Sequence, residues 1–153
     1  MRRDLATLAP VAALPASLRR LDFTAQTAVD AHRLLVLGRQ YGGGQVLDFD
    51  SWMNAFEHDP EYDRALCLIL ADAQGVVAVA QCWTSAFIRL LVVDPRAHRR
   101  GIGRALLEHV FALFQQRGEG HVDLKVMENN LPARRLYEQA GMEYVLRSEL
   151  DPR

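Results

Sequence analysis

The chain has 153 residues, of which 50% are hydrophobic, and a formal net charge of −1. This length suits one hydrophobic core, so we expect residues 1–153 to form a single domain, with residues 1–17 as a loose N-terminal lead-in. The balanced charge argues against a sequence-independent binder of nucleic acid. No apolar run approaches the roughly 20 residues that span a bilayer, so we expect no membrane partner.

The first residues and the two cysteines indicate a cytoplasmic protein. The arginines of Met1–Asp4 are followed by an acid, and Pro10 and Pro15 interrupt the apolar stretch behind them, so we expect no secretory signal peptide. Cys67 and Cys82 lack the close spacing of a metal motif and are too few for a disulfide framework. Reduced thiols are typical of the cytoplasm.

The first half of the chain predicts a weak strand and two helices. Leu18–Phe23 has a loose strand pattern, and apolar residues recur at helical spacing from Thr24 to Gly38, where the glycine is expected to end the helix. A shorter helix is expected from Asp50 to His58. Tyr41–Gly44 lies between the helices and contains three glycines, which suit either a plain linker or a lid.

Three apolar runs make the middle of the chain β-rich. Ala65–Ala71 and Val76–Trp83 flank the turn Asp72–Gly75, which predicts a hairpin. Phe87–Val93 forms a third run, which ends at an Asp-Pro pair. Continuous apolar strands of this kind are typical of a sheet that is buried on both faces.

The last third of the chain alternates between helix and strand. A broad apolar stripe predicts a helix over Gly101–Arg117, and alternation predicts a strand over His121–Val126. Leu131–Ala140 has the pattern of a helix with Asn130 as its N-cap, and Met142–Arg147 that of a last strand. The order β-α-α-β-β-β-α-β-α-β indicates a layered α/β domain.

A basic loop joins the third apolar strand to the strongest helix. This helix begins on Gly101 and Gly103, and the first-turn N–H groups of a helix have no internal partner, which favours a bound anion. A glycine lets the anion approach the backbone because it has no Cβ. Arg99, Arg100 and Arg104 add positive charge at the same place. The loop therefore predicts a phosphate site.

Two common phosphate motifs do not match this loop. The Walker pattern G-x-x-x-x-G-K-[ST] is absent. The dinucleotide pattern G-x-G-x-x-G would have Leu106 in place of its third glycine, and its glycines would directly follow the strand. Asp123 lies where that motif places a ribose-binding acid, but we expect it in the middle of a strand.

Two segments resemble the signatures of the GCN5-related N-acetyltransferase superfamily. The first signature, [QR]-x-x-G-x-[GA] at the start of a helix, corresponds to His98–Gly103. The second, N-x-x-A-x-x-L-Y-E-x-x-G-F, corresponds to Asn130–Met142, which reads NLPARRLYEQAGM. The resemblance runs from about Ile88 to Met142, and one helix and one strand separate the two signatures.

The resemblance implies a mixed, mostly antiparallel sheet of six to seven strands, with helices on both faces and a splay between the fourth and fifth strands. It implies an N-acetyltransferase that moves an acetyl group from acetyl-CoA, its co-substrate, to a primary amine by direct attack in a ternary complex, without a metal. Tyr137 is the implied acid for the departing thiolate. The implied cofactor-binding residues are Leu91, Val92, Val93, His98, Arg99, Arg100, Gly101, Ile102, Gly103, Arg104 and Asn130.

The chain departs from the family pattern in three places. His98 stands where the family prefers Gln or Arg, so its contact is open. Some relatives carry a catalytic Glu where this chain has Arg89 and Lys125, so a carboxylate base is absent there. A non-catalytic regulatory module that binds CoA is therefore an alternative. The chain ends soon after the last expected strand, so a seventh strand is either missing or supplied by a partner, as in a homodimer.

The acceptor amine is left open by the sequence. It belongs either to a small molecule or to a protein, and the acidic stretch Glu57–Asp63 is either a solvated loop or an attractor of cationic amines.

Asn130 also fits a simple helix cap, and Tyr137 a core position. A contact with nucleic acid through Arg96–Arg104 is a weaker alternative.

Overall fold

The computed structural model describes residues 1–6, 8, 13–39 and 45–146. Its strands are β1 (Arg2–Asp4), β2 (Arg19–Leu21), β3 (Tyr62–Asp72), β4 (Gly75–Trp83), β5 (Phe87–Val93) and β6 (His121–Leu124). Its helices are α1 (Ala25–Arg39), α2 (Phe49–His58), the 3-10 turn η1 (Pro95–Ala97), α3 (Ile102–Gln116) and α4 (Leu131–Gln139). Within the described ranges, no helix has the length and apolar character that a membrane crossing requires.

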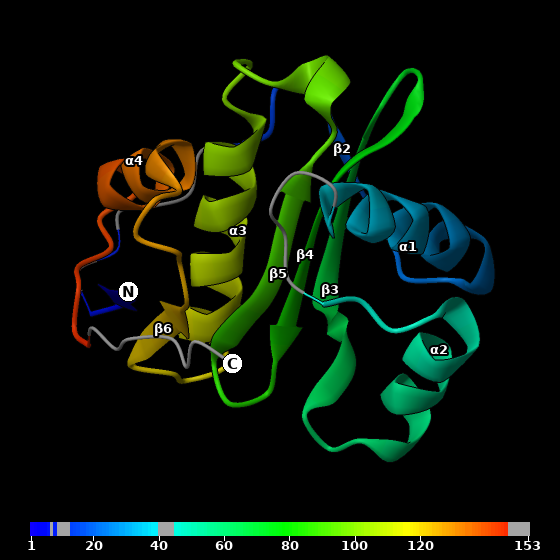
Figure 1. The fold of residues 1–153 in the computed structure, drawn as a ribbon, viewed down its shortest axis with the longest axis horizontal. Helices are drawn as coiled ribbons and strands as arrows, with labels where there is room; N and C mark the ends of the chain where they lie inside the picture. Colours follow the sequence, from blue (N-terminus) through cyan, green and yellow to red (C-terminus); the bar gives the residue numbers. More distant parts are fainter. Residues whose placement is uncertain (7, 9–12, 40–44, 147–153) are drawn as a thin grey trace.

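All six strands join one sheet in the order β1-β6-β5-β4-β3-β2. The pair β5–β6 is parallel, and the other pairs are antiparallel. Helices α1 and α2 lie on one side of the sheet and α3 and α4 on the other (Figure 1). This arrangement confirms the mixed, mostly antiparallel α/β fold that the sequence predicts.

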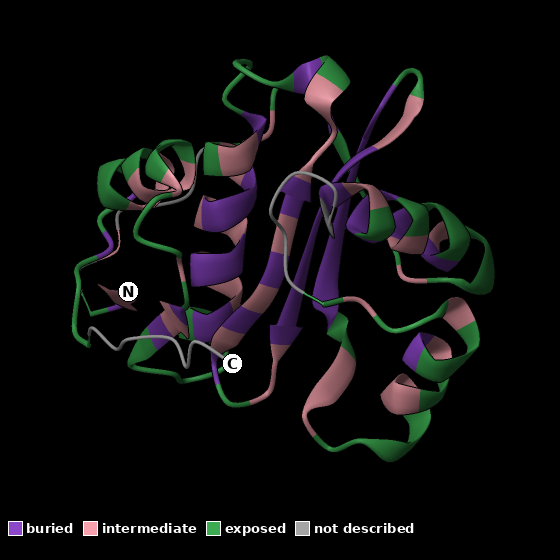
Figure 2. Ribbon diagram, in the orientation of Figure 1, coloured by how far each residue is buried: buried purple, intermediate pink, exposed green. Residues whose placement is uncertain are grey.

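Alternate residues of the long strands face the two helical layers. On β3, Leu66, Leu68 and Leu70 belong to the core that includes α3, whereas Cys67 and Ile69 belong to the core that includes α1 and α2. All five are buried, and Figure 2 shows buried positions along the central strands and α3. The sheet is therefore covered on both faces, as its unbroken apolar runs predict.

Helix α1 approaches the sheet through a glycine. The sequence suggested Gly38 as the end of this helix, but the helix continues to Arg39. A Cβ added to Gly38 would lie 2.5 Å from Cγ2 of Val92 on β5. The glycine therefore serves close packing of α1 against β5. The glycine-rich segment Tyr41–Gly44, considered as a linker or lid, lies outside the described residues.

Replacing Gly38 by alanine is expected to destabilise the fold by about 1–3 kcal/mol, because the new methyl group overpacks the contact with Val92. The higher helix propensity of alanine offsets less than about 1 kcal/mol of this. Gly120→Ala is the matched control, since a Cβ there has no neighbour within 4 Å. Urea unfolding measures both, and a Gly38→Ala/Val92→Ala double variant should lose less than the sum of its single variants.

The N-terminal residues form an edge strand, whereas the sequence suggested a loose lead-in over residues 1–17. β1 pairs antiparallel with β6, and Arg2 also bridges to Glu143. The guanidinium of Arg2 donates to both carboxylate oxygens of Asp123, at 2.8 and 3.0 Å. Met1 and Leu5 are buried in the core. A strand of three residues with two arginines has no apolar alternation by which the sequence could predict it.

The C-terminal strand expected at Met142–Arg147 is reduced, within the described residues, to the single bridge at Glu143. β1 lies beside β6 at this end of the sheet. The chain's own N-terminal segment therefore extends the sheet at the edge beyond β6.

Candidate functional site

The strands β5 and β6 separate soon after they meet. They pair only at Phe87↔Asp123 and Ile88↔Leu124, while β5 continues to Val93. Beyond Ile88, this edge of β5 has no strand partner among the described residues. The sheet is therefore splayed at the place that the family resemblance implies.

The open edge of β5 presents backbone groups that pair with no other strand among the described residues. The N–H of Asp94 donates to the carbonyl of Val77 on β4, at 2.8 Å. Because backbone groups alternate in direction along a strand, Leu91 and Val93 direct their N–H and C=O groups away from β4, toward the open edge. An extended ligand could therefore pair with β5 as an added strand.

The N-terminus of α3 lies directly after this strand and has unfilled donors. Its N-cap is Gly101, with φ 72° and no side chain to accept a hydrogen bond. Within the described part of the chain, no backbone N–H from Arg99 to Arg104 has an acceptor. Such groups, together with the helix dipole, attract an anion. We call these six backbone N–H groups the N–H cradle.

The two glycines of the loop have different structural roles. Gly101 needs its left-handed backbone, and a Cβ there would meet no atom within 4 Å. A Cβ on Gly103 would lie 3.2 Å from Cδ2 of Leu136 and 3.5 Å from Cγ2 of Val93. Gly103 therefore lets the start of α3, the middle of α4 and the end of β5 meet. This packing role adds to the close anion approach that the sequence suggested for both glycines.

An ion-pair cluster holds the loop in place. Arg96 donates to both oxygens of Asp72, at 2.8 and 3.1 Å, and Arg100 lies 3.6 Å from the same carboxylate. Asp94 accepts from the backbone N–H of Arg96. Asp72 is nearly buried, and the hydrogen bond from Arg96 holds the pKa of its carboxyl well below the usual range. This cluster could not be predicted from the sequence, because Asp72 has the pattern of an ordinary turn residue.

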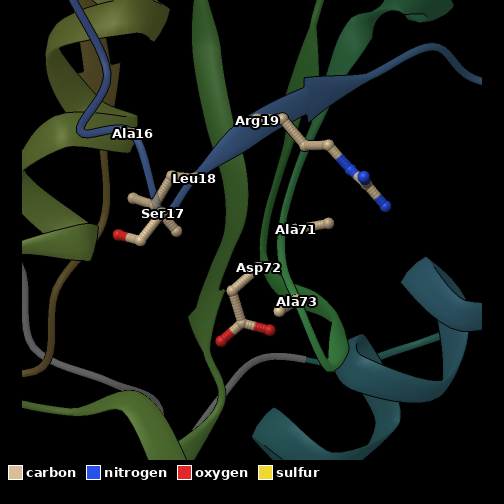
Figure 3. A pocket seen from close by; sticks show the side chains of 7 residues that line it. All are labelled: Ala16, Ser17, Leu18, Arg19, Ala71, Asp72 and Ala73. Carbon is tan, nitrogen blue, oxygen red and sulfur yellow. The ribbon is translucent and has the colours of Figure 1, made fainter.

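Figure 3 shows Asp72 at the end of the β3–β4 hairpin, beside a cavity of about 230 Å³. The cavity is lined by residues 16–19 and 71–73. Its other lining side chains are small or apolar apart from Ser17 and Arg19. We assign it no ligand.

Replacing Asp72 by asparagine is expected to destabilise the protein and to loosen the loop at neutral pH. The folded state depresses the pKa of Asp72 below its unfolded value of about 3.9. Its stabilising contribution is thus present above about pH 4 and is lost as the pH falls further. Denaturant midpoints at pH 7 and pH 3 should show a smaller difference between wild type and Asp72→Asn at pH 3. Asp30→Asn, which removes an exposed partner of Arg33, should change little.

The four arginines of the loop differ in how far they are available to a ligand. Arg96 and Arg100 share Asp72, and Arg104 pairs with Glu108 at 3.1 Å. Arg99 is exposed and has no ion pair among the described residues. Of the positive charges that the sequence placed at this site, Arg99 is therefore the least engaged within the protein.

His98 lies at the strand end and not at the N–H cradle. Its Nε2 donates to the carbonyl of Val93, at 3.0 Å, on the open edge of β5. The carbonyl retains a second lone pair for another donor. His98 therefore braces the turn between β5 and η1, and its contact with the cofactor stays a prediction.

Helix α4 carries the remaining predicted site residues. Asn130 caps it, because Oδ1 accepts from the N–H of Ala133 at 3.3 Å, and its amide nitrogen has no acceptor in the part of the chain that the structure describes. Tyr137 packs against the core on the α3 side, and its hydroxyl makes no hydrogen bond with described residues. Burial raises the pKa of Tyr137. Leu136, which contacts the Gly103 position, brings this part of α4 to the start of α3.

A second pocket of about 320 Å³ lies on the other face of the sheet. It is lined by Gln45, Val46, Leu47, Trp52, Tyr62, Gln81, Trp83, Arg89 and Leu90. Arg89 and Leu90 lie at the start of the open stretch of β5. The sequence analysis noted Arg89 because some relatives carry a glutamate at that position. The aromatic walls of the pocket, which come from α2, β3 and β4, could not be identified from the sequence.

The acids of Glu57–Asp63 do not line this pocket. Glu57 lies 3.6 Å from Arg64, Glu61 accepts from Ser85, and Asp63 pairs with Arg117. Their partners lie within the protein, so the geometry favours the solvated, structural interpretation of this stretch.

The cysteines do not form a nucleophilic site. Both are buried, and burial raises the pKa of Cys67 to about 12. The pKa of Cys82 is raised as well, mainly by burial. A thiol is the weak form of this nucleophile. Within the described residues, no group of three His, Cys, Asp or Glu side chains is placed to hold a metal ion.

Comparison with known proteins relates this chain to acetyltransferases. Residues 31–142 match the model of the Acetyltransferase (GNAT) family. A mycothiol acetyltransferase of Clavibacter michiganensis subsp. michiganensis is 39% identical over 88 residues, which are 54% of this chain and 28% of that protein. The [Ribosomal protein bS18]-alanine N-acetyltransferase of Escherichia coli strain K12 is 43% identical over 51 residues, which are 33% of this chain and 34% of that protein.

The fold is also found in solved structures. The crystal structure of a GCN5-related N-acetyltransferase from Sphaerobacter thermophilus superposes with a TM-score of 0.72 and 24% identity, over 93% of this chain and 46% of that one. At this identity the likeness concerns the fold. The chain spans about a third of the length of the curated relatives above and about half of this structural one.

Proposed function

Since the chain belongs to the GNAT acetyltransferase family, we propose that it transfers an acetyl group from acetyl-CoA to a primary amine by direct attack in a ternary complex. The observation that carries this proposal is the N–H cradle at the end of a strand whose outer edge is open. A pyrophosphate and an extended amide-bearing arm need these two features side by side.

The residues at this site fit a coenzyme A thioester. The N–H cradle and Arg99 would hold the pyrophosphate, and Gly101 leaves its surroundings open to it. Leu91 and Val93 would pair with the pantetheine arm, while Val92 packs on α1 behind them. The amide nitrogen of Asn130 would donate to the same ligand.

Two groups of the protein would then assist acyl transfer. The backbone N–H of Leu91 lies on the open edge and would stabilise negative charge on the thioester oxygen. Tyr137 would donate a proton to the leaving sulfur. A phenol with a raised pKa is a weaker acid than a thiol of pKa about 8.5, so Tyr137 would act in part as a hydrogen-bond donor.

The general base for the acceptor amine is the catalytic role for which this site offers the least. Arg89 and Lys125 stand where some relatives carry a glutamate, so neither position supplies a carboxylate for the proton of the amine. The amine therefore enters in its deprotonated form, and its proton passes to water. The rate with a given amine should accordingly rise with pH until most of that amine is deprotonated in solution.

The proposal is tested by following thiol release from acetyl-CoA across a panel of amines. The panel covers amino acids, amino acid amides, polyamines, aminoglycosides and a peptide with an N-terminal alanine, since the relatives named above include both small-molecule and protein acetyltransferases. Release with at least one amine, with acetylated product confirmed by mass, is the expected result. Stabilisation by acetyl-CoA without release from any amine would favour the non-catalytic CoA-binding module instead.

A further inference from the structure

The pocket on the α1–α2 face contains a buried amide, Gln81, that a neighbouring indole orients. Trp52 Nε1 donates to Oε1 of Gln81 at 3.0 Å, which fixes the orientation of that buried amide. The amide nitrogen of Gln81 is left without an acceptor among the described residues. The indole N–H of Trp83, in the same wall, is likewise buried without an acceptor there. Two residues that line the pocket, Gln81 and Trp83, therefore each carry an N–H group without an acceptor in the described part of the chain.

Arg89 adds a positive charge to these donors. Its guanidinium lies over the ring of Trp83, 5.8 Å from the centroid, and donates to the carbonyl of Gln45 at 3.2 Å. It has no carboxylate partner within the described ranges, unlike Arg96 and Arg104. A half-buried arginine without an acid is a natural partner for a carboxylate, which it can bind through two N–H groups.

A β-bulge places Arg89 in this position. In the β4–β5 ladder, Gln81 pairs with Leu90 and Cys82 with Ile88, so Arg89 has no opposite residue. A bulge of this kind re-aims the side chain of the extra residue. Arg89 is also two residues from Leu91, whose N–H faces the open edge, so a group held by Arg89 lies within a small molecule's length of the proposed reaction centre.

We propose that this pocket binds the carboxylate of a small acceptor, and that the acceptor is an amino acid or a related amino-carboxylate with an apolar or aromatic side chain. The inference rests on the proposed function for the identity of the reaction. The volume of about 320 Å³ is at the small end for ligand sites. Tyr62, Trp83 and Leu90 provide walls for the apolar part. Arg89 would repel polycations, because none of the lining residues is acidic.

The first test compares L-phenylalanine with L-phenylalaninamide, and L-leucine with L-leucinamide, as acceptors at saturating acetyl-CoA and pH 8. The acids should have a kcat/KM about 10- to 100-fold above that of the amides, which is the range for a hydrogen-bonded charged group. The amine of an amide is less basic and thus more deprotonated at this pH, so intrinsic reactivity favours the opposite order. Equal or better use of the amides would overturn the proposal while leaving acetyl transfer itself intact.

The second test assigns the preference to Arg89. In Arg89→Gln the acid-to-amide ratio should fall to about one, and in Arg89→Lys it should be partly retained. The matched control is Arg33→Gln, an exposed arginine on α1 that should keep the wild-type ratio. Circular dichroism checks the folding of each variant. If Arg89→Gln does not fold, the comparison of acids with amides on the wild-type chain still decides the proposal.

Binding without turnover separates this proposal from the proposed function. Calorimetric titration of the CoA-loaded chain with L-phenylalanine should show binding, and L-phenylalaninamide should bind at least about tenfold more weakly. Selective binding of the acid without acetylation of any amine would count against the transferase and for the carboxylate pocket. Equal binding of both compounds, or of neither, would overturn the pocket assignment.

Discussion

Replacing Tyr137 by phenylalanine is expected to lower kcat by about 10- to 100-fold, with little change in the affinity for acetyl-CoA. The change removes the hydroxyl that would donate to the departing sulfur and keeps the ring that packs against the core. General acids contribute about 10²–10⁴-fold. We expect a loss at or below the low end of this range, because the raised pKa of Tyr137 makes full proton transfer to a thiolate unfavourable.

The matched control for this variant is Tyr144→Phe. Tyr144 is exposed and its hydroxyl is engaged with Arg134 and Glu138, so kcat should be unaffected. Steady-state kinetics at saturating acetyl-CoA measure both variants, and calorimetry checks cofactor binding. Because the pKa of Tyr137 lies above its usual value of about 10, its phenol stays protonated from pH 7 to 9. Full activity in Tyr137→Phe would show that this residue has only a packing role.

Replacing Gly101 by valine is expected to weaken acetyl-CoA binding by about 10-fold or more. The φ of 72° at this position is costly for a β-branched residue, by about 1–3 kcal/mol, and relief of this strain would reorient the N–H cradle. The side chain would also occupy space that is now open beside the cradle. Both effects act on the anion site.

Gly118→Val separates cofactor binding from backbone strain. Gly118 has φ 84° and, like Gly101, no neighbour within 4 Å of an added Cβ, but it follows the opposite end of α3. The Gly118→Val variant should lose about as much stability as Gly101→Val and leave the dissociation constant for acetyl-CoA unchanged. Calorimetric titration of both variants decides the matter. Equal affinities in the two variants would mean that the start of α3 does not hold the cofactor.

The second half of the chain was the easier half to predict. The apolar stripe of α3 and the apolar run of β5 are long and strongly patterned. The glycines and arginines between them indicate accessible backbone donors and positive charge. The expectation of a phosphate site rests on those residues alone. The splay between β5 and β6 could not be predicted in this way, because a missing strand pair leaves no pattern in either strand, and it came from the family resemblance.

Other features depend on contacts between distant residues. Gly38 looks like a helix stop until Val92 is seen beside it, and Asp72 looks like a turn residue until Arg96 is seen on it. The bulge at Arg89 is a property of the register between β4 and β5. Such features arise from tertiary packing, which the local propensity of a segment cannot predict.

The most direct test of the central claim is the thermal unfolding of the chain with and without acetyl-CoA. Ligand that binds only the folded state adds about 2.7 kcal/mol of stability at a concentration of 100 times its dissociation constant. We expect the unfolding midpoint to rise with acetyl-CoA and to rise far less in Gly101→Val. An unchanged midpoint at millimolar acetyl-CoA would contradict the assignment of the N–H cradle and the open edge of β5 to a coenzyme A thioester.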